Sequence, residues 1–224
     1  MRVSVIIPAY NEEQALGQVL RELPKEPALD VVVVDNGSTD RTFMIAQAAH
    51  VKVAYEPRRG YGQACQTGLR MIAPESDVVV FLDGDHSDFP EELPKLVGPI
   101  ERNEADVVIG SRTLGQAQPG SLTPQQRFGN WLACRLIALR FGTRFSDLGP
   151  FRAIRRSVLE QLHLRDRGFG WNVEMQLKAI KAKLRIVEVT VRYRPRIGQS
   201  KISGTLPGTV RAALAILGMV ARHW

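Results

Sequence analysis

Three aspartates lie within six residues, directly after an apolar run, in the segment FLDGDHSDFP at residues 81–90. Carboxylates this close repel one another unless a cation or several hydrogen-bond donors lie among them. A pair such as Asp83 and Asp85 offers the oxygen ligands that Mg²⁺ and Mn²⁺ prefer, and a bound ion can in turn hold a diphosphate. The alternative is a solvated acidic turn in which Asp88 caps a helix that starts at Pro90.

The segments around this cluster alternate between strand and helix patterns. Continuous apolar runs predict buried strands, and the amphipathic stretches between them predict helices, the first over residues 11–23 with Asn11 as its cap. The apolar runs are VSVIIPAY, DVVVVDNG, VKVAYE, DVVVFLD and DVVIGSR. This alternation predicts an α/β fold in which helices cover both faces of a mostly parallel sheet.

Polar residues stand at the ends of four predicted strands. These residues are Tyr10, Asn11, Glu12, Asp35, Asp83, Asp85, Ser111 and Arg112. In open parallel sheets, ligands bind outside the carboxyl ends of the strands. The pattern therefore favours one shared crevice over a set of unrelated caps and turns.

The charge is divided unevenly along the chain. The 224 residues carry a formal net charge of +7, made up of −6 over residues 1–100 and +13 over residues 101–224. A basic second half indicates an anionic partner, either phosphate groups, a membrane surface or nucleic acid, unless it is a solvated basic surface. The two cysteines, Cys65 and Cys134, have no metal-binding spacing and indicate reduced thiols in a cytosolic protein.

The second half ends in two segments with separate predictions. Residues 197–205, IGQSKISGT, predict a polar loop with Lys201 at its centre. Residues 205–224 predict an amphipathic helix whose apolar core, AALAILGMVA, is about half the length that spans a membrane. Such a helix can lie in the membrane interface, pack on protein, or begin a truncated membrane segment. At the other end, the run in MRVSVIIPAY is too short for a signal peptide.

Taken together, the motifs resemble the family 2 glycosyltransferases with the GT-A fold, in the branch of the dolichyl- and polyprenyl-phosphate mannosyl- or glucosyltransferases. The residues that carry the resemblance are IIPAYNEE, VVDNGSTDRT, GYGQACQTGLRMI, FLDGDHSDFPEELPKLV, VIGSR, SDLGPFRAIRR and WNVEMQLKAIKAKLRIVEVTVRYRPRIGQSKIS, in the family's order. The resemblance implies a catalytic domain over residues 1–204, with a nucleotide-binding half (1–112) and an acceptor half (113–204), followed by the helix at 205–224.

The resemblance also assigns roles in binding the donor. Pro8, Tyr10, Glu12 and Asp35 would form the floor for the base and ribose of a nucleotide sugar, with Asp35 accepting a hydrogen bond from the base. The family usually has a second aspartate where this chain has Asn36.

Asp83 and Asp85 match the metal-binding DxD motif of the family, and Asp85 is the main expected ligand of Mg²⁺ or Mn²⁺. The family often has a glutamine in the position of Ser87, so no third protein ligand is expected from that residue.

Further along the chain, Arg112 and Arg127 match phosphate-binding arginines, and Arg196 and Lys201 match a late loop that closes over donor and acceptor phosphates. Asp147 has two interpretations: a general base for a hydroxyl acceptor, or a loop residue that binds backbone or arginine side chains.

Three other residues near these motifs have weaker assignments. His86 is expected to line the site rather than to act as a base or ligand. Trp171 and Glu174 either position the sugar or begin a packed helix.

These residues predict a metal-dependent, inverting transferase that moves a hexose from a GDP- or UDP-sugar to a polyprenyl phosphate at the cytoplasmic membrane face. The partners are a nucleotide sugar, a polyprenyl phosphate and a membrane surface, but no nucleic acid; a homo-oligomer or a membrane-protein anchor is left open. The alternatives are a soluble transferase with a hydroxyl acceptor, a phosphohydrolase with an aspartate nucleophile in FLDGD, and a non-catalytic protein that binds anions or membranes. The phosphohydrolase would need a later Ser or Thr and a Lys in matching strand contexts, which the sequence does not place. The binding protein leaves the ordered carboxylates unexplained.

Overall fold

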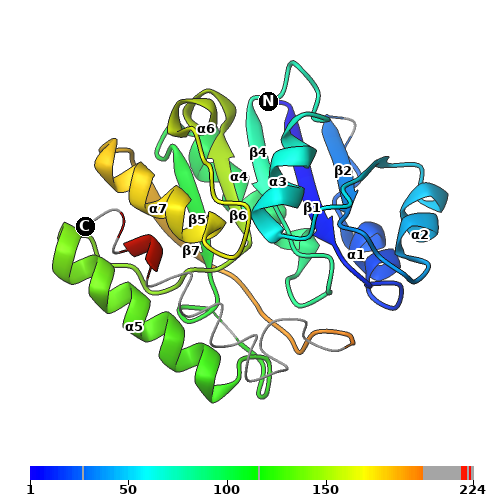
Figure 1. The fold of residues 1–224 in the computed structure, drawn as a ribbon. Coiled ribbons are helices and arrows are strands. Elements are labelled where there is room, and N and C mark those ends of the chain that lie inside the picture. Colours follow the sequence, from blue (N-terminus) through cyan, green and yellow to red (C-terminus); the bar gives the residue numbers. More distant parts are fainter. Residues whose placement is uncertain (27, 116, 199–217, 221, 223–224) are drawn as a thin grey trace.

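The fold is built around one seven-stranded sheet (Figure 1). The computed structural model describes residues 1–26, 28–115, 117–198, 218–220 and 222. The strands are β1 (Val3–Ala9), β2 (Leu29–Asp35), β3 (Lys52–Tyr55), β4 (Val78–Phe81), β5 (Val107–Ser111), β6 (Arg152–Arg155) and β7 (Ile186–Thr190). Their order is β3-β2-β1-β4-β6-β5-β7, and β6 alone among them runs antiparallel to its neighbours β4 and β5.

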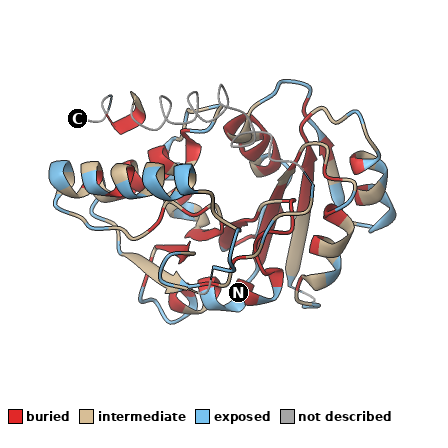
Figure 2. Ribbon diagram, turned by 90° about the horizontal axis from the view of Figure 1, so that it is seen from below, coloured by how far each residue is buried: buried red, intermediate tan, exposed pale blue. Residues whose placement is uncertain are grey.

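Helices cover both faces of this sheet, as the sequence pattern predicts. They are α1 (Leu16–Glu22), α2 (Thr42–Ala48), α3 (Tyr61–Leu69), the 3₁₀ turn η1 (Pro90–Glu92), α4 (Leu93–Glu101), α5 (Pro124–Phe141), α6 (Arg156–Leu162) and α7 (Trp171–Lys181). Side chains alternate across a strand, so Val5 and Ile7 of β1 pack in the core with α1 and α4, whereas Ile6 packs in the core with α3 and α7. Figure 2 shows this buried interior running along the central strands.

The strand order reverses direction between β1 and β4, and this reversal positions the site. β1 and β4 pair in parallel, with Ile6 opposite Phe81, so the segments that follow them leave the same edge of the sheet. The chain then turns to opposite sides, toward β2 from β1 and toward β5 from β4. A crevice at such a switch point is where open α/β sheets bind ligands.

The first predicted helix begins later than expected, and Asn11 is not its cap. The helix starts at Leu16, and Ala15 precedes it without a side-chain cap. Asn11 instead takes a left-handed backbone conformation with φ of 52°, and its side-chain oxygen accepts a hydrogen bond from the Thr39 amide at 2.8 Å. The four residues after Asn11 therefore form a turn that directs Glu12 toward the sheet edge.

Helix α5 lies away from the sheet, where α7 supports it (Figure 1). It starts with a capping box, in which the Thr123 side chain accepts from the Gln126 amide, and ends at Gly142 in a left-handed conformation. Its buried side meets Val173 and Leu177 of α7 in a small separate core.

The predicted helix at 205–224 lies mostly outside the described residues. Of its described part, residues 218–220 are helical, and Met219 and Val220 pack into the small core between α5 and α7. None of the helices within the described part of the chain is long and apolar enough to cross a membrane.

Candidate active site

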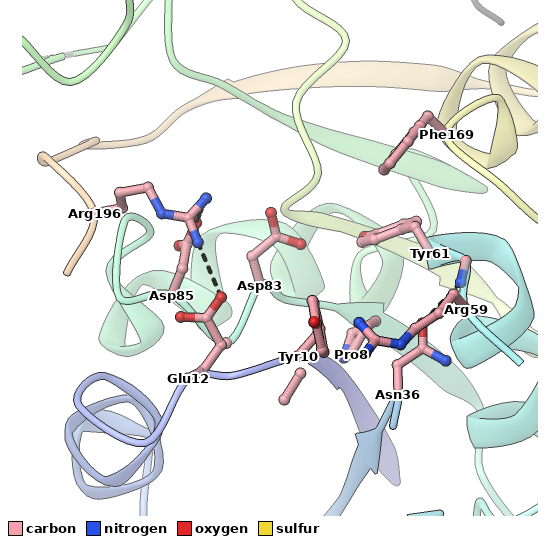
Figure 3. A pocket seen from close by; sticks show the side chains of 13 residues that line it. Pro8, Tyr10, Glu12, Asn36, Arg59, Tyr61, Asp83, Asp85, Phe169 and Arg196 are labelled. Atoms are coloured by element: carbon pink, nitrogen blue, oxygen red, sulfur yellow. Dashed lines mark hydrogen bonds and ion pairs between the residues drawn. The ribbon is translucent and has the colours of Figure 1, made fainter. Parts of the chain in front are cut away.

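A cavity of about 270 Å³ opens at the carboxyl ends of β1 and β4. Its lining residues come from six separated segments of the chain: Pro8, Ala9, Tyr10, Glu12, Asn36, Arg59, Gly60, Tyr61, Asp83, Gly84, Asp85, Phe169 and Arg196. Figure 3 shows two distinct sides, with Glu12, Asp85 and Arg196 on one, and Arg59, Tyr61 and Phe169 on the other. Asp83 lies between them. The arrangement places charged groups beside aromatic ones within a single cavity.

The two aspartates of the DxD motif occupy the centre and one wall of this cavity. Asp85 is fixed by the chain that follows it, because its Oδ1 accepts hydrogen bonds from the Ser87 amide at 3.0 Å and the Ser87 hydroxyl at 2.5 Å. Asp83 is held more loosely: its Oδ1 is buried and has no hydrogen-bond partner among the described residues. Burial, followed by the nearby charge of Asp85, raises the pKa of Asp83 to about 7.

These two carboxylates fit a divalent cation. An unpartnered buried carboxylate oxygen is costly unless a ligand satisfies it, and a cation would also relieve the repulsion from Asp85. The described residues contain no cluster of three or more histidine, cysteine or acidic groups that could hold a metal without further ligands. The site therefore suits an ion such as Mg²⁺, which one or two carboxylates hold together with phosphate oxygens and water.

Arg196 reaches into the acidic side of the cavity from the segment after β7. Its Nη2 donates to Glu12 Oε1 at 2.9 Å, and its Nη1 lies 3.2 Å from Asp85 Oδ2. The backbone supports this position, because the Ile197 amide donates to the Asp85 carbonyl oxygen at 3.0 Å. Three of the residues that the sequence assigned to the site, Glu12, Asp85 and Arg196, are thus in direct contact.

The other side of the cavity offers flat surfaces. The guanidinium carbon of Arg59 lies 3.4 Å from the ring centroid of Tyr10, a stacked cation–π arrangement. Tyr61 and Phe169 complete this side. Aromatic faces and a guanidinium plane are the groups on which a nucleotide base stacks.

The side chain of Asn36 holds the loop that carries Arg59. Its Nδ2 donates to the carbonyl oxygens of Glu56 at 3.0 Å and Arg58 at 2.7 Å, and its Oδ1 accepts from the Gly60 amide at 2.9 Å. A carboxylate cannot donate, so an aspartate could not hold this loop in the same way. Asn36 therefore positions the segment that carries Arg59.

Asp35 does not line the cavity in this structure. It is almost fully buried at the end of β2, where its Oδ1 accepts from the Ser38 amide at 3.0 Å. The geometry therefore does not support the expected hydrogen bond from a base to Asp35, whereas Pro8, Tyr10 and Glu12 line the cavity.

Arg112 and Asp147 form a buried pair outside the cavity. Arg112 donates from Nε to Asp147 Oδ2 at 2.8 Å and from Nη2 to Oδ1 at 2.7 Å, and its backbone amide also donates to Oδ2 at 2.8 Å. Asp147 has no exposed surface. Of the two interpretations of Asp147, the structure supports the arginine-binding one, because the carboxylate is buried and both its oxygens accept from Arg112.

Arg127 is not among the residues that the cavity brings together. Arg127 is exposed on the first turn of α5 and does not line the cavity. Lys201 lies outside the described residues.

The three weaker assignments have structural explanations. His86 bonds Glu22 at 2.8 Å and does not line the cavity. Trp171 is buried against Phe81, with ring centroids 6.1 Å apart, and Glu174 accepts hydrogen bonds from the amides of Arg165 and Asp166. Trp171 and Glu174 thus begin a packed helix, and His86 stabilises the loop after β4.

Arg59, Tyr61 and Phe169 line the cavity but were not predicted as site residues. Phe169 reaches the cavity because the loop before α7 packs closely on α3. At Gly60 and Gly62, an added Cβ would lie 2.1 Å from the Arg167 carbonyl oxygen and 2.2 Å from that of Asp166. The glycines of RRGYG were the available signal, because glycine in such a turn indicates a close backbone approach.

Comparison with known proteins decides the family. The family model for Glycosyl transferase family 2 matches residues 4–163. The chain belongs to this family. It is a glycosyltransferase, and its sheet of mostly parallel strands between helices is the GT-A fold that the sequence predicted.

Several relatives resemble this family 2 glycosyltransferase over nearly their whole length. An uncharacterized glycosyltransferase of Mycobacterium tuberculosis is 36% identical over 214 residues, which cover 95% of this chain and 94% of the relative. The undecaprenyl-phosphate mannosyltransferase of Micrococcus luteus is 32% identical over 235 residues, covering 99% and 96%. The dolichyl-phosphate hexose transferase of Haloferax volcanii is 32% identical over 203 residues, covering 89% and 86%.

Among solved structures, glucosyl-3-phosphoglycerate synthase from Mycobacterium tuberculosis has a similar fold. Its complex with Mn²⁺, UDP and glucosyl-3-phosphoglycerate matches with a TM-score of 0.76 at 24% sequence identity, covering 98% of this chain and 80% of the other. This likeness supports the fold of the glycosyltransferase.

Proposed function

We propose that the chain transfers a hexose from a GDP- or UDP-sugar to a polyprenyl phosphate at the cytoplasmic face of a membrane, with inversion and with Mg²⁺ or Mn²⁺. The observation that carries the proposal is the two-sided cavity, in which the acidic pair Asp83 and Asp85 lies next to a stacked Tyr10 and Arg59. A nucleotide sugar has the same two parts, a flat base and a charged diphosphate.

In this proposal, the flat side of the cavity binds the nucleoside. Tyr10, Arg59 and Phe169 offer ring and guanidinium planes for the base, and Asn36 keeps the Arg59 loop in place. Glu12 lies on the acidic side of the cavity beside Arg196, and in this proposal it binds a hydroxyl of the ribose (Figure 3). Carboxylates accept hydrogen bonds from hydroxyl groups.

The acidic side binds the diphosphate. Asp83 and Asp85 would hold Mg²⁺ or Mn²⁺, which would supply positive charge against the diphosphate as it leaves. Arg196 lies beside the same carboxylates and can donate charge-assisted hydrogen bonds to phosphate oxygens. Lys201, which follows Arg196 on the same segment of the chain, adds a further positive charge in this proposal.

Two observations favour a phosphate acceptor over a hydroxyl acceptor. A hydroxyl acceptor needs a general base, and the candidate Asp147 is buried in its pair with Arg112 and does not line the cavity. A phosphate monoester needs no base, because its second pKa is about 6 and it is largely ionised at neutral pH. Relatives above 30% identity over most of the chain are, by name, an undecaprenyl-phosphate mannosyltransferase and a dolichyl-phosphate hexose transferase.

The test is release of nucleoside diphosphate by the purified protein. A panel of GDP- and UDP-sugars is assayed with Mn²⁺, with Mg²⁺ and with EDTA, each in the presence and absence of a polyprenyl phosphate. Asp85→Ala removes a metal ligand, and Glu91→Gln is the matched control, because Glu91 lies six residues away and pairs with Arg192 outside the cavity. We expect release that requires metal, lipid phosphate and Asp85, and that Glu91→Gln leaves intact.

Other outcomes separate the parts of the proposal. Release that needs Asp85 but not the lipid would retain the transferase and reject the acceptor. Release in EDTA equal to that with metal would reject the role of the ion. If no donor gave any release and the protein also bound none of the nucleotides, the proposed transfer from a GDP- or UDP-sugar would be rejected.

A further inference from the structure

Helix α5 exposes an apolar face on the side opposite its buried one. Ala133, Cys134 and Ile137 are buried toward the rest of the protein. On the outer side, 62% of Phe128, 54% of Trp131 and 83% of Leu139 is exposed. Together with Arg135, these residues recur every three or four positions, so they form one stripe along the helix, here called the outer face of α5.

The side chains of the outer face contact one another and do not stand singly. The rings of Phe128 and Trp131 contact each other, with centroids 5.8 Å apart, and the Arg135 guanidinium lies 6.0 Å from the Trp131 ring. Isolated exposed apolar residues are common on soluble proteins, but a row of large ones on one helix marks an interaction surface. Figure 2 shows the exposed side of α5 facing away from the sheet.

Helix α5 and the segments directly before and after it carry only positively charged side chains up to residue 146. Residues 107–146 contain five arginines and no aspartate or glutamate. Arg127, Arg135 and Arg144 are exposed and form no salt bridge with any residue in the described part of the chain, whereas most arginines of the sheet layers do. The face therefore has the charge that complements an anionic surface.

We propose that the outer face of α5 docks on the surface of an anionic lipid bilayer, with Phe128, Trp131 and Leu139 inserted between headgroups and the arginines around them paired with lipid phosphates. The proposal goes beyond the proposed function by assigning the membrane contact to one face of one helix, and it needs neither donor nor acceptor.

The pattern of side chains favours a lipid surface over a protein partner. A helix in the membrane interface has arginines beside its apolar stripe, and aromatic rings at the level of the headgroups. A protein partner would have to offer a matching acidic and apolar groove, whereas an anionic bilayer supplies both properties anywhere on its surface.

The position of α5 determines where the cavity would lie when the outer face docks on a membrane. The segment that follows β5 runs from Arg112 through residues 113–123 into the first turn of α5. That first turn lies on the side of the molecule toward which the parallel strands run, and it carries Phe128 (Figure 1). Docking of the outer face would therefore hold the sheet edge with the cavity near the lipid surface.

The test is co-sedimentation of the full chain with vesicles, without nucleotide or acceptor. Vesicles of phosphatidylcholine alone are compared with vesicles that also contain phosphatidylglycerol. We expect binding only to the anionic vesicles. The double variant Arg127→Gln/Arg135→Gln should weaken it about 25-fold, which corresponds to about 1 kcal/mol for each arginine at the surface. Trp131→Ser/Leu139→Ser should weaken it at least about tenfold, because both insert apolar surface.

The matched control is Met44→Ser/Tyr55→Ser, which removes two comparably exposed apolar side chains, Met44 at 65% and Tyr55 at 59%, from the acidic half. This control should bind vesicles as the wild type does, and circular dichroism should show all variants folded. Binding that survives both α5 double variants would overturn the proposal, as would absence of binding by the wild type. Concentration-dependent dimerisation that Trp131→Ser abolishes, without vesicle binding, would reassign the face to a second copy of the chain. None of these outcomes depends on turnover, so they leave the proposed function to its own test.

Discussion

The guanidinium of Arg196 lies 3.2 Å from the carboxylate of Asp85, the second aspartate of the DxD motif. Arg196 also donates to Glu12 at 2.9 Å, so it joins the segment after β7 to the segments after β1 and β4. Its positive charge offsets part of the negative charge of Glu12 and Asp85. The contact implies competition between Arg196 and a divalent ion for Asp85.

Arg196→Ala should strengthen Mn²⁺ binding in the absence of nucleotide. Removal of one positive charge beside a partly exposed carboxylate is worth about 1 kcal/mol, which corresponds to roughly a fivefold lower Kd. Isothermal titration calorimetry with Mn²⁺ alone measures this without turnover. Arg192→Ala is the control, because Arg192 pairs with Glu91 and Glu92 rather than with cavity residues, and it should leave the Kd unchanged. Weaker Mn²⁺ binding by Arg196→Ala would contradict the competition.

The pair of Arg112 and Asp147 should contribute strongly to stability. Asp147→Ala leaves a buried guanidinium without its forked partner, and such a loss costs about 3–5 kcal/mol. Urea denaturation followed by circular dichroism gives the free energy of unfolding. Arg112→Lys should not rescue the pair, because an ammonium cannot make two parallel hydrogen bonds to one carboxylate.

The matched control for this pair is Glu160→Ala. Its partner Arg156 is also an arginine, but the Glu160 side chain is 64% exposed, and an exposed pair of this kind contributes about 0.5 kcal/mol or less. If Asp147→Ala were as mild as Glu160→Ala while activity was lost, Asp147 would be a free catalytic group rather than a structural one.

Much of the sheet and of the acidic side could be predicted because these features follow from local pattern. Runs such as DVVVFLD are buried on both faces of a strand, and the residue after a parallel strand must lie at the sheet edge, so Glu12, Asp83 and Asp85 converge without further information. Asn11 was wrongly expected to cap α1, because the chain forms a left-handed turn there, a choice that depends on Ser38 and Thr39 from another loop.

The flat side of the cavity could not be predicted for a different reason. Phe169 reaches it only because the loop before α7 packs on the start of α3, about 100 residues earlier in the chain. The Gly62 and Gln63 amides donate to the carbonyl oxygens of Gly168 and Arg167 across this contact. The glycines of RRGYG indicate a close backbone approach, but nothing within either segment identifies the loop before α7 as the partner.

The ionisation of Glu56 should make the free energy of unfolding depend on pH in the acidic range. Its carboxylate accepts from Gln63 at 2.9 Å, Thr67 at 2.7 Å and the Arg58 amide at 2.9 Å. Burial opposes ionisation, but these hydrogen bonds prevail and lower the pKa of Glu56 from 4.5 to about 2. A lowered pKa in the folded state stabilises the protein above the unfolded pKa, and this contribution is lost as the pH falls through the range from 4.5 to 2.

The measurement compares the wild type with Glu56→Gln by urea denaturation at several pH values. At pH 7 the variant should be less stable by about 2 kcal/mol, since it keeps the shape of the side chain but loses the charge that accepts these bonds. The difference should shrink as the pH approaches 2. A difference that stays constant with pH would show that the hydrogen bonds do not depend on ionisation.

Substitution by alanine should lower the stability at Gly68 and raise it at Gly129. A Cβ at Gly68 in α3 would lie 2.5 Å from Ile6 Cγ2 and 3.1 Å from Val34 Cγ2, both from buried strand residues that cannot move aside. Overpacking of this kind costs about 1–3 kcal/mol, which outweighs the gain of up to about 1 kcal/mol from the better helix propensity of alanine. At Gly129 in α5, a Cβ would meet no atom within 4 Å, so only the propensity gain remains. Thermal unfolding should therefore show a lower Tm for Gly68→Ala and a higher Tm for Gly129→Ala, and a rise in both would mean that α3 can shift away from β1 and β2.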